Sequence, residues 1–112
     1  MKQVLNGGLV VALLVIPAVA SARGQAHVDR GQQVFAAQKC SICHSIAGQG
    51  NKKGSLDGVG AKLSADEIRQ WIVNAPDMTA KAKAERKPVM KAYVLPKDEL
   101  DSLVAYLQTL KK

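Results

Sequence analysis

Both cysteines of this 112-residue chain lie in one short segment, "QKCSICHS", which spans residues 38 to 45. Cys40, Cys43 and His44 therefore fall within five positions. Three kinds of chemistry use such a cluster: a disulfide, one corner of a metal site, or the anchor of a covalently attached cofactor. The surrounding sequence decides among these alternatives.

A disulfide and a zinc ion both fit this cluster poorly. A bridge between Cys40 and Cys43 would close a loop that is too small to stabilise the chain much. Structural zinc takes four protein ligands, and the one remaining histidine, His27, lies 13 residues before Cys40. We expect His27 to be a solvated residue. A thioredoxin-like redox pair would require a βαβ pattern, which the sequence lacks.

The spacing of the cluster matches C-x-x-C-H, the attachment pattern of a c-type haem. Cysteines at positions i and i+3 lie on one side of a helical turn, so Cys40 and Cys43 can reach vinyl groups on neighbouring pyrroles of one porphyrin. Both sulfurs then become thioethers, and the His44 imidazole projects beneath the iron. The pattern predicts one covalently bound haem c with His44 as an axial iron ligand.

The second axial position can be filled by a methionine, and the candidates are Met78 and Met90. A lone methionine in an apolar stretch often only fills the core. Met90, however, lies in "PVMKAY", where a proline-braced loop can pass across the far face of a porphyrin. Met78 lies in a stretch rich in lysine and alanine that does not indicate a loop of this kind. We therefore predict that Met90 is the second axial ligand.

The first 22 residues differ from the rest of the chain. Lys2 is followed by an apolar run without charge that ends in the small residues "AVASA". This order is typical of a secretory signal peptide, and we predict cleavage after Ala22, with Ala20 as the alternative. An uncleaved anchor fits less well, because Asn6, two glycines and Pro17 interrupt a run that is shorter than the roughly 20 apolar residues of a spanning helix.

Removal of residues 1–22 takes away only Lys2 among the charged side chains and leaves one domain, residues 23–112, with 15 basic and 9 acidic residues and a net charge of +6. A domain of this size buries a modest fraction of its surface, so something else should fill the core. No nucleophile, carboxylate pair or phosphate-binding loop indicates an enzyme. Nucleic acid is not an expected partner of an exported protein, and no stable membrane anchor is expected.

Three helices are expected to position these residues. Apolar residues at helical spacing predict helices over 29–39, 64–74 and 97–110. Asp29 is the expected cap of the first helix, and an S-x-x-E capping box starts the second.

The segments between these helices predict irregular structure. Residues 45–63 contain five glycines and form a long loop, which in so small a domain is functional or wraps around something. Residues 77–87 fit a short polar helix or an irregular crossing, and residues 88–96 form a loop. No segment predicts a sheet. The expected fold class is all-α, with three to four helices wrapped around one covalently bound haem.

Over nearly its whole length the mature chain resembles the small soluble class I cytochromes c. Beyond C-x-x-C-H and the glycine-rich loop, the shared features are Gly31 and Phe35, Met90, Tyr93 and the helix ending "VAYL" at 104–107. The resemblance implies the class I cytochrome c fold, in which the first helix crosses the last at the glycine–aromatic pair. The expected partners in the last helix are Leu103 and Tyr106.

The sequence departs from this family in the loop after the haem motif. Ser55 stands where the family has a proline whose carbonyl usually holds the haem histidine. The resemblance then implies that the Ser55 carbonyl accepts from the ring N–H of His44. Trp71 resembles a tryptophan that the family has in "W-I/L-x-N-P"-like segments, which implies packing on the haem edge with the indole N–H near a propionate.

Histidine–methionine ligation raises the reduction potential and closes both axial positions of the iron. The resemblance therefore implies a monomeric, monohaem, single-electron carrier of the periplasm that is not an enzyme. Its implied partners are redox proteins with acidic docking surfaces, a reductase or dehydrogenase as donor and a terminal oxidase or reductase as acceptor. The alternatives are a haem-bearing electron-entry subunit of a larger oxidoreductase, and a gas-binding or peroxidatic protein with five-coordinate iron.

Basic side chains gather around Met90. Glu85 is the one acidic residue between Met78 and Lys97. We expect these basic groups to surround the haem edge and to steer the carrier towards acidic partners. This basic segment consists of Lys81, Lys83, Arg86, Lys87, Lys91 and Lys97.

Overall fold

The structure, a computed structural model, describes residues 7–8, 11–12 and 19–112. Most of the predicted signal peptide lies outside these residues. In the described part, no helix is long and apolar enough to cross a membrane. The elements are α1 (Val19–Ala37), η1 (Cys40–Ile42), β1 (Ser45–Ile46), β2 (Gln49–Gly50), η2 (Lys52–Gly54), α2 (Val59–Lys62), α3 (Ala65–Val73), α4 (Ala75–Ala82) and α5 (Lys97–Gln108), where η is a 3₁₀ turn.

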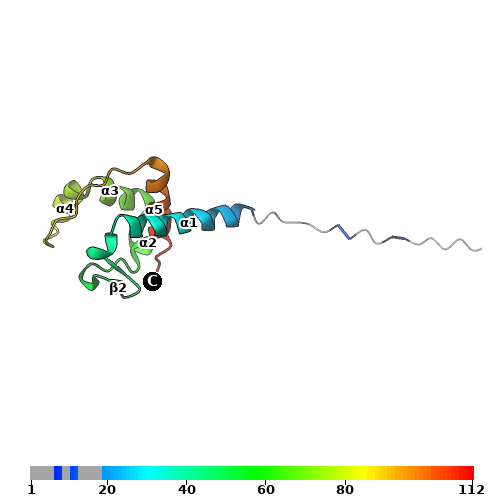
Figure 1. The fold of residues 1–112 in the computed structure, drawn as a ribbon, viewed down its shortest axis with the longest axis horizontal. Helices are drawn as coiled ribbons and strands as arrows, with labels where there is room; N and C mark the ends of the chain where they lie inside the picture. The colour runs from blue at the N-terminus through cyan, green and yellow to red at the C-terminus, as the bar shows by residue number, and fades with distance from the viewer. Residues whose placement is uncertain (1–6, 9–10, 13–18) are drawn as a thin grey trace, which may run out of the picture.

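Helices α1 and α5 cross each other and make the most extensive contact between elements of the fold (Figure 1). At the crossing, Gly31 of α1 lies directly against the Ser102 carbonyl and the Cβ of Tyr106. The Phe35 ring meets the Tyr106 ring edge-on, with 6.0 Å between centroids. The predicted packing of the Gly31–Phe35 pair on the last helix is therefore confirmed.

The hydrophobic core lies where α1, α3 and α5 meet. Each helix contributes residues at helical spacing, as an amphipathic helix must if one face is to be buried. Most of these side chains also line a hollow described below. The buried cluster consists of Val34, Phe35, Ile68, Ile72, Leu103, Val104 and Leu107.

Helix α3 begins as its sequence predicts. The Ser64 hydroxyl accepts from the Glu67 backbone N–H at 3.1 Å, and the Glu67 carboxylate accepts from the Ser64 N–H at 3.0 Å. The capping box is thus complete, so two backbone N–H groups that have no partner within the helix are satisfied. Pro76 follows this helix and lies in the first turn of α4. Proline has no backbone N–H, and at this position an N–H would have no partner within the helix.

The first helix begins earlier than predicted. It extends back to Val19, so the expectation that Asp29 caps it was wrong. The Asp29 carboxylate instead accepts from the side chain of Gln25, one turn earlier, at 2.8 Å. No proline lies between Val19 and Asp29, so nothing in this stretch removes a backbone donor and stops the helix.

The segment 45–63 contains more regular structure than the predicted loop. A two-residue hairpin pairs Ser45 with Gly50, because Ala47 and Gly48 both take positive φ angles, of 52° and 80°, that suit a tight turn. The expectation of no sheet was wrong to this small extent. The single-turn helix α2 follows and raises the number of described helices to five.

The later elements agree more closely with their sequence. Within 77–87, α4 covers the residues up to Ala82, and the remainder is irregular. Residues 88–96 form a loop, as predicted. Helix α5 ends at Gln108, slightly before the predicted boundary at residue 110.

Gly31→Ala should destabilise the folded protein by about 3 kcal/mol, the upper part of the range for overpacking. A Cβ at Gly31 would overlap the Ser102 carbonyl, and this backbone atom can move only if α1 and α5 separate. Denaturant unfolding of the haem-loaded protein measures the effect. Gly24→Ala is the control, because nothing lies near that position of the same helix. It lies at the start of the predicted mature chain, so it should change the stability by less than about 0.5 kcal/mol. Equal stabilities of the two variants would contradict the close crossing.

Candidate haem-binding site

One continuous hollow opens between the crossed helices and the 88–96 loop. Its inner part has a volume of about 200 Å³ and a lining that is almost wholly apolar. Its outer part, the mouth, has about 520 Å³ and includes charged side chains. The two parts share six lining residues, namely Gln38, Cys40, His44, Trp71, Met90 and Tyr93. An apolar interior with a more polar mouth suits a large flat group with one polar edge.

The C-x-x-C-H turn forms one wall of this hollow. Lys39 takes a left-handed conformation that ends α1 and starts η1. The N–H groups of Cys43 and His44 both donate to the Cys40 carbonyl, at 3.1 and 2.9 Å. Cys40 lines both parts of the hollow and Cys43 lines the mouth. Cys40 and Cys43 are not joined in a disulfide, and burial raises the pKa of the Cys40 thiol.

The His44 side chain is held by the backbone of the neighbouring loop. Its Nδ1 lies 2.9 Å from the carbonyl oxygen of Gly54. A carbonyl can only accept, so Nδ1 carries the proton and the Nε2 lone pair stays free for a metal. Burial lowers the pKa of His44, the Gly54 bond opposes this shift, and the Arg86 charge adds to it. The imidazole is therefore neutral, as an iron ligand must be.

The acceptor for His44 differs from the one implied by the resemblance, which was Ser55. Gly54 is the last residue of η2, and its carbonyl faces the imidazole. Ser55 leaves this turn with extended backbone and forms a bridge with Ser45. The 3₁₀ turn thus supplies the carbonyl one residue earlier, without a proline.

Asn51 binds the backbone of the C-x-x-C-H turn through hydrogen bonds, a role that was not identified from the sequence. Its backbone N–H lies 3.1 Å from the carbonyls of both Ser41 and His44, and its side-chain amide donates to the Ile42 carbonyl at 3.1 Å. Its side-chain oxygen also caps η2 by accepting from Lys53. An asparagine before a tight turn is a typical cap, and that was the available signal.

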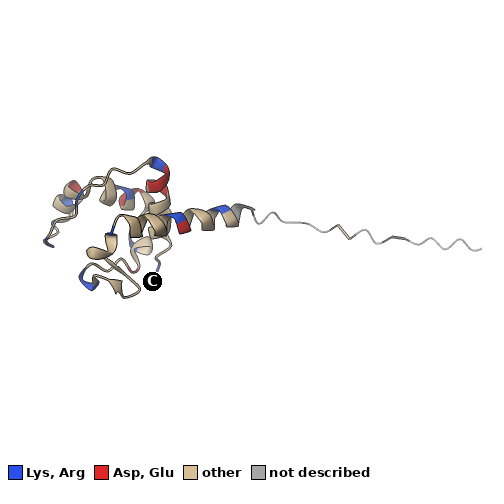
Figure 2. Cartoon of the chain, in the orientation of Figure 1, with Lys and Arg blue, Asp and Glu red and all other residues tan. Residues whose placement is uncertain are grey.

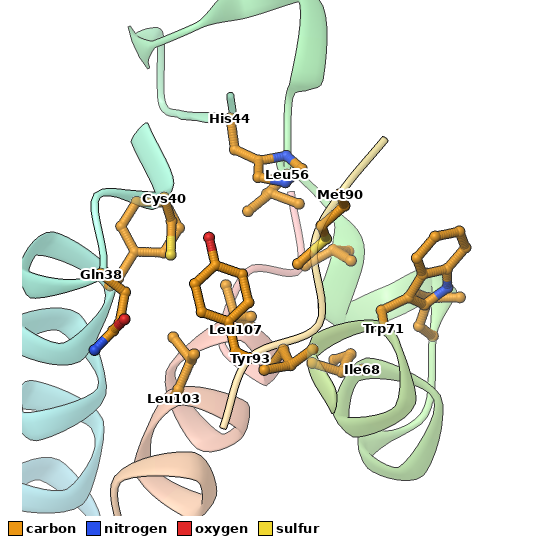
Figure 3. Close-up of a pocket in the computed structure, with 14 residues that line it drawn as sticks. Gln38, Cys40, His44, Leu56, Ile68, Trp71, Met90, Tyr93, Leu103 and Leu107 are labelled. Atoms are coloured by element: carbon orange, nitrogen blue, oxygen red, sulfur yellow. The ribbon is translucent and has the colours of Figure 1, made fainter. Parts of the chain in front are cut away.

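Met90 and Tyr93 enter the hollow from the 88–96 loop. The loop is attached to α3 by the Tyr93 N–H, which donates to the Ile72 carbonyl at 2.9 Å. Figure 3 shows the Met90 side chain and the Tyr93 ring in the same hollow as His44. Met78, although half-buried on α4, does not line it. The structure thus brings Cys40, His44 and Met90 together.

Further lining residues come from α3 and from the segment before it, and one of them, Trp71, was expected at the haem edge from the resemblance. Trp71 of α3 lines both parts of the hollow. Apolar side chains between the hairpin and α3 complete the inner part, and their spacing carried no signal because all of them lie in the segment predicted to be a loop. They are Leu56, Val59 and Leu63.

Charges at the mouth are basic. Two members of the basic segment line it, Arg86 and Lys91, together with Lys39. The Lys91 ammonium lies 4.9 Å from the centroid of the Tyr93 ring. Lys97 instead pairs with Asp101 at 2.7 Å in the first half of α5, where Figure 2 shows the acidic residues of that helix.

The hollow fits a c-type haem on three observations: an apolar interior, two cysteines on one turn, and an imidazole whose Nδ1 faces a carbonyl, which leaves Nε2 free. Fold and site together define a small all-α haem protein. The family model of cytochrome c matches residues 28–111, and the chain belongs to this family. No curated protein and no solved structure matches the chain.

Membership of this family implies a covalently bound c-type haem with iron and a role in haem-based electron transfer. Cys40 and Cys43 fit the attachment motif. Among the residues that the structure describes, no three His, Cys, Asp or Glu side chains gather as a metal-ion site.

Proposed function

We propose that this protein is a periplasmic single-electron carrier in which His44 and Met90 are the axial ligands of the haem iron. One observation carries the proposal. His44 and Met90 lie 46 positions apart in the chain, yet both line the hollow onto which Cys40 opens. Export of the chain is supported by the order of Lys2, an apolar run and small residues before Ala22.

The roles of the side chains follow from their contacts. Gly54 fixes the orientation and tautomer of His44, and the Tyr93–Ile72 bond holds the loop that carries Met90. Burial raises the pKa of Tyr93, so this residue stays neutral near the group. The haem supplies the one-electron chemistry. With His44 and Met90 as its two axial ligands, a bound haem iron would have no position left for a substrate, which is the arrangement of a carrier.

The mouth of the hollow is the proposed contact with redox partners. Lys39, Arg86 and Lys91 are exposed there, so a partner with an acidic surface would be attracted to the point nearest the haem edge. Electrostatic steering of this kind raises association rates by tenfold or more at low salt.

Electron transfer to the native partner should slow as salt rises. The screening length falls from about 10 Å at 0.1 M to about 3 Å at 1 M ionic strength. Lys91 lines the mouth, and Lys87 lies in the chain between Arg86 and Pro88, which line it too. The double variant Lys87→Glu/Lys91→Glu should therefore slow transfer about tenfold at low salt, with an unchanged haem spectrum and a flatter salt dependence. Stopped-flow measurement of the second-order rate constant tests both expectations.

The control for this experiment is Lys62→Glu/Lys112→Glu, which makes the same charge change at residues that do not line the hollow. This control should retain most of the wild-type rate. Salt-independent transfer in the wild type, or equal slowing in the two double variants, would contradict steering through the mouth. Sedimentation of the purified protein adds a second readout, because a free carrier is a monomer and a permanent subunit is not.

A further inference from the structure

Arg86 lies against the backbone of the C-x-x-C-H turn although it belongs to the irregular segment after α4. Its Nη2 donates to the Cys43 carbonyl at 2.6 Å, across 43 positions of sequence. Its Nη1 lies so close to the Cα of Gly54 that a Cβ there would overlap the guanidinium. The guanidinium therefore rests on both Cys43 and Gly54.

These two residues are the ones that hold His44. Cys43 precedes it in the chain, and the Gly54 carbonyl lies 2.9 Å from its Nδ1. Arg86 can therefore act on the imidazole through the Cys43 peptide group, which it hydrogen-bonds, and through its close contact with Gly54. The same residue lies four positions before Met90, so its bond to Cys43 also connects the segment leading to Met90 with the turn that carries the cysteines.

The charge of Arg86 is permanent, since a guanidinium does not lose its proton in proteins. None of the ion pairs found among the described residues involves Arg86, and each of them uses a carboxylate of α5. They are Arg30–Glu99, Arg69–Asp101 and Lys97–Asp101. No carboxylate among the described residues therefore pairs with the guanidinium at Cys43.

We propose that Arg86 is a positioning residue that raises the reduction potential of the haem iron from the His44 side. The inference rests on the proposed role of His44 as an axial ligand. Oxidation adds one positive charge at the iron, and a fixed cation held nearby disfavours that charge. The charge-assisted bond also draws electron density from the Cys43 peptide group, next to the imidazole. His44 then donates less electron density to the iron, which also raises the reduction potential.

Potentiometric titration of the haem-loaded full chain tests this role with three variants. Arg86→Gln removes the charge and should shift the one-electron equilibrium about fivefold towards the oxidised form, as expected for the loss of a partly screened charge. Arg86→Lys keeps the charge and should retain most of the wild-type potential. Lys83→Gln removes one charge from the same exposed segment, at a residue that does not line the hollow, and should shift the equilibrium less than twofold.

Two results would overturn the inference. One is a shift in Arg86→Gln no larger than that in Lys83→Gln. The other is an equal fall in Arg86→Lys and Arg86→Gln, because the side chain would then act as a tether and not through its charge. The absorption spectrum of the wild type separates this inference from the proposed function. If the wild type shows no methionine ligation, the axial assignment is refuted. If methionine ligation is intact and Arg86→Gln has the wild-type potential, only the role of Arg86 is refuted.

Discussion

Replacing both Cys40 and Cys43 by alanine should release the haem completely into acidified organic solvent, whereas the wild-type protein should retain all of it. These are the two cysteines of the chain, so no other thiol can form a thioether. Cys40→Ala and Cys43→Ala should each leave at most one bond, with a shifted absorption band from the unreacted vinyl group. Solvent extraction followed by absorption spectroscopy of both phases measures the outcome.

The matched control is Ile42→Ala, inside the same turn. Ile42 is 66% exposed and lines only the mouth of the hollow, so its loss leaves both anchors in place, and the haem should stay with the protein. Free extraction of haem from the wild type would refute covalent attachment through this turn.

Met90→Ala should remove the methionine-to-iron charge-transfer band of the oxidised protein and lower the reduction potential by on the order of 0.1 V, within the range of about 0.8 V that axial ligands span. The thioether side chain stabilises the reduced iron, and alanine at this position cannot reach it. The reduced variant should also bind carbon monoxide, which the wild type should exclude. Absorption spectra and potentiometric titration measure these three changes.

Met78→Ala is the matched control because it removes the same side chain from a half-buried position outside the hollow. It should cost about 1 kcal/mol of stability and leave the spectrum and the potential unchanged. If the two variants behave the other way round, Met78 and not Met90 is the ligand.

Local sequence was enough to predict the elements whose signals lie within one turn or one helix. The Ser64–Glu67 capping box and the apolar stripe of α5 specify their helices through contacts three or four residues apart. The same locality explains the prediction of Cys40, Cys43 and His44, since all three lie on one turn of backbone. The prediction that Asp29 caps the first helix was wrong because a residue suited to capping does not begin a helix when the residues before it can also be helical.

Contacts between distant segments could not be predicted in this way. The choice of Gly54 over Ser55 as the acceptor for His44 depends on where η2 ends relative to the imidazole, and a shift of one residue changes the carbonyl that faces the ring. The hydrogen bonds between Asn51 and the C-x-x-C-H turn also depend on this arrangement. The spacing of residues in the sequence does not show which backbone carbonyl will face the ring of a distant residue.

The sequence by itself determined the chemistry of this protein: a covalent haem, because five consecutive positions hold both thiols and the imidazole, and an all-α domain, because helical periodicity is a local property. Only the tertiary structure decided what surrounds that chemistry. It placed Met90, which the sequence already favoured over Met78, in the same hollow as His44, and it placed Arg86 at the Cys43 carbonyl. These contacts join residues more than 40 positions apart, and they form because the crossing of α1 and α5 leaves an apolar space that the intervening segments must enclose.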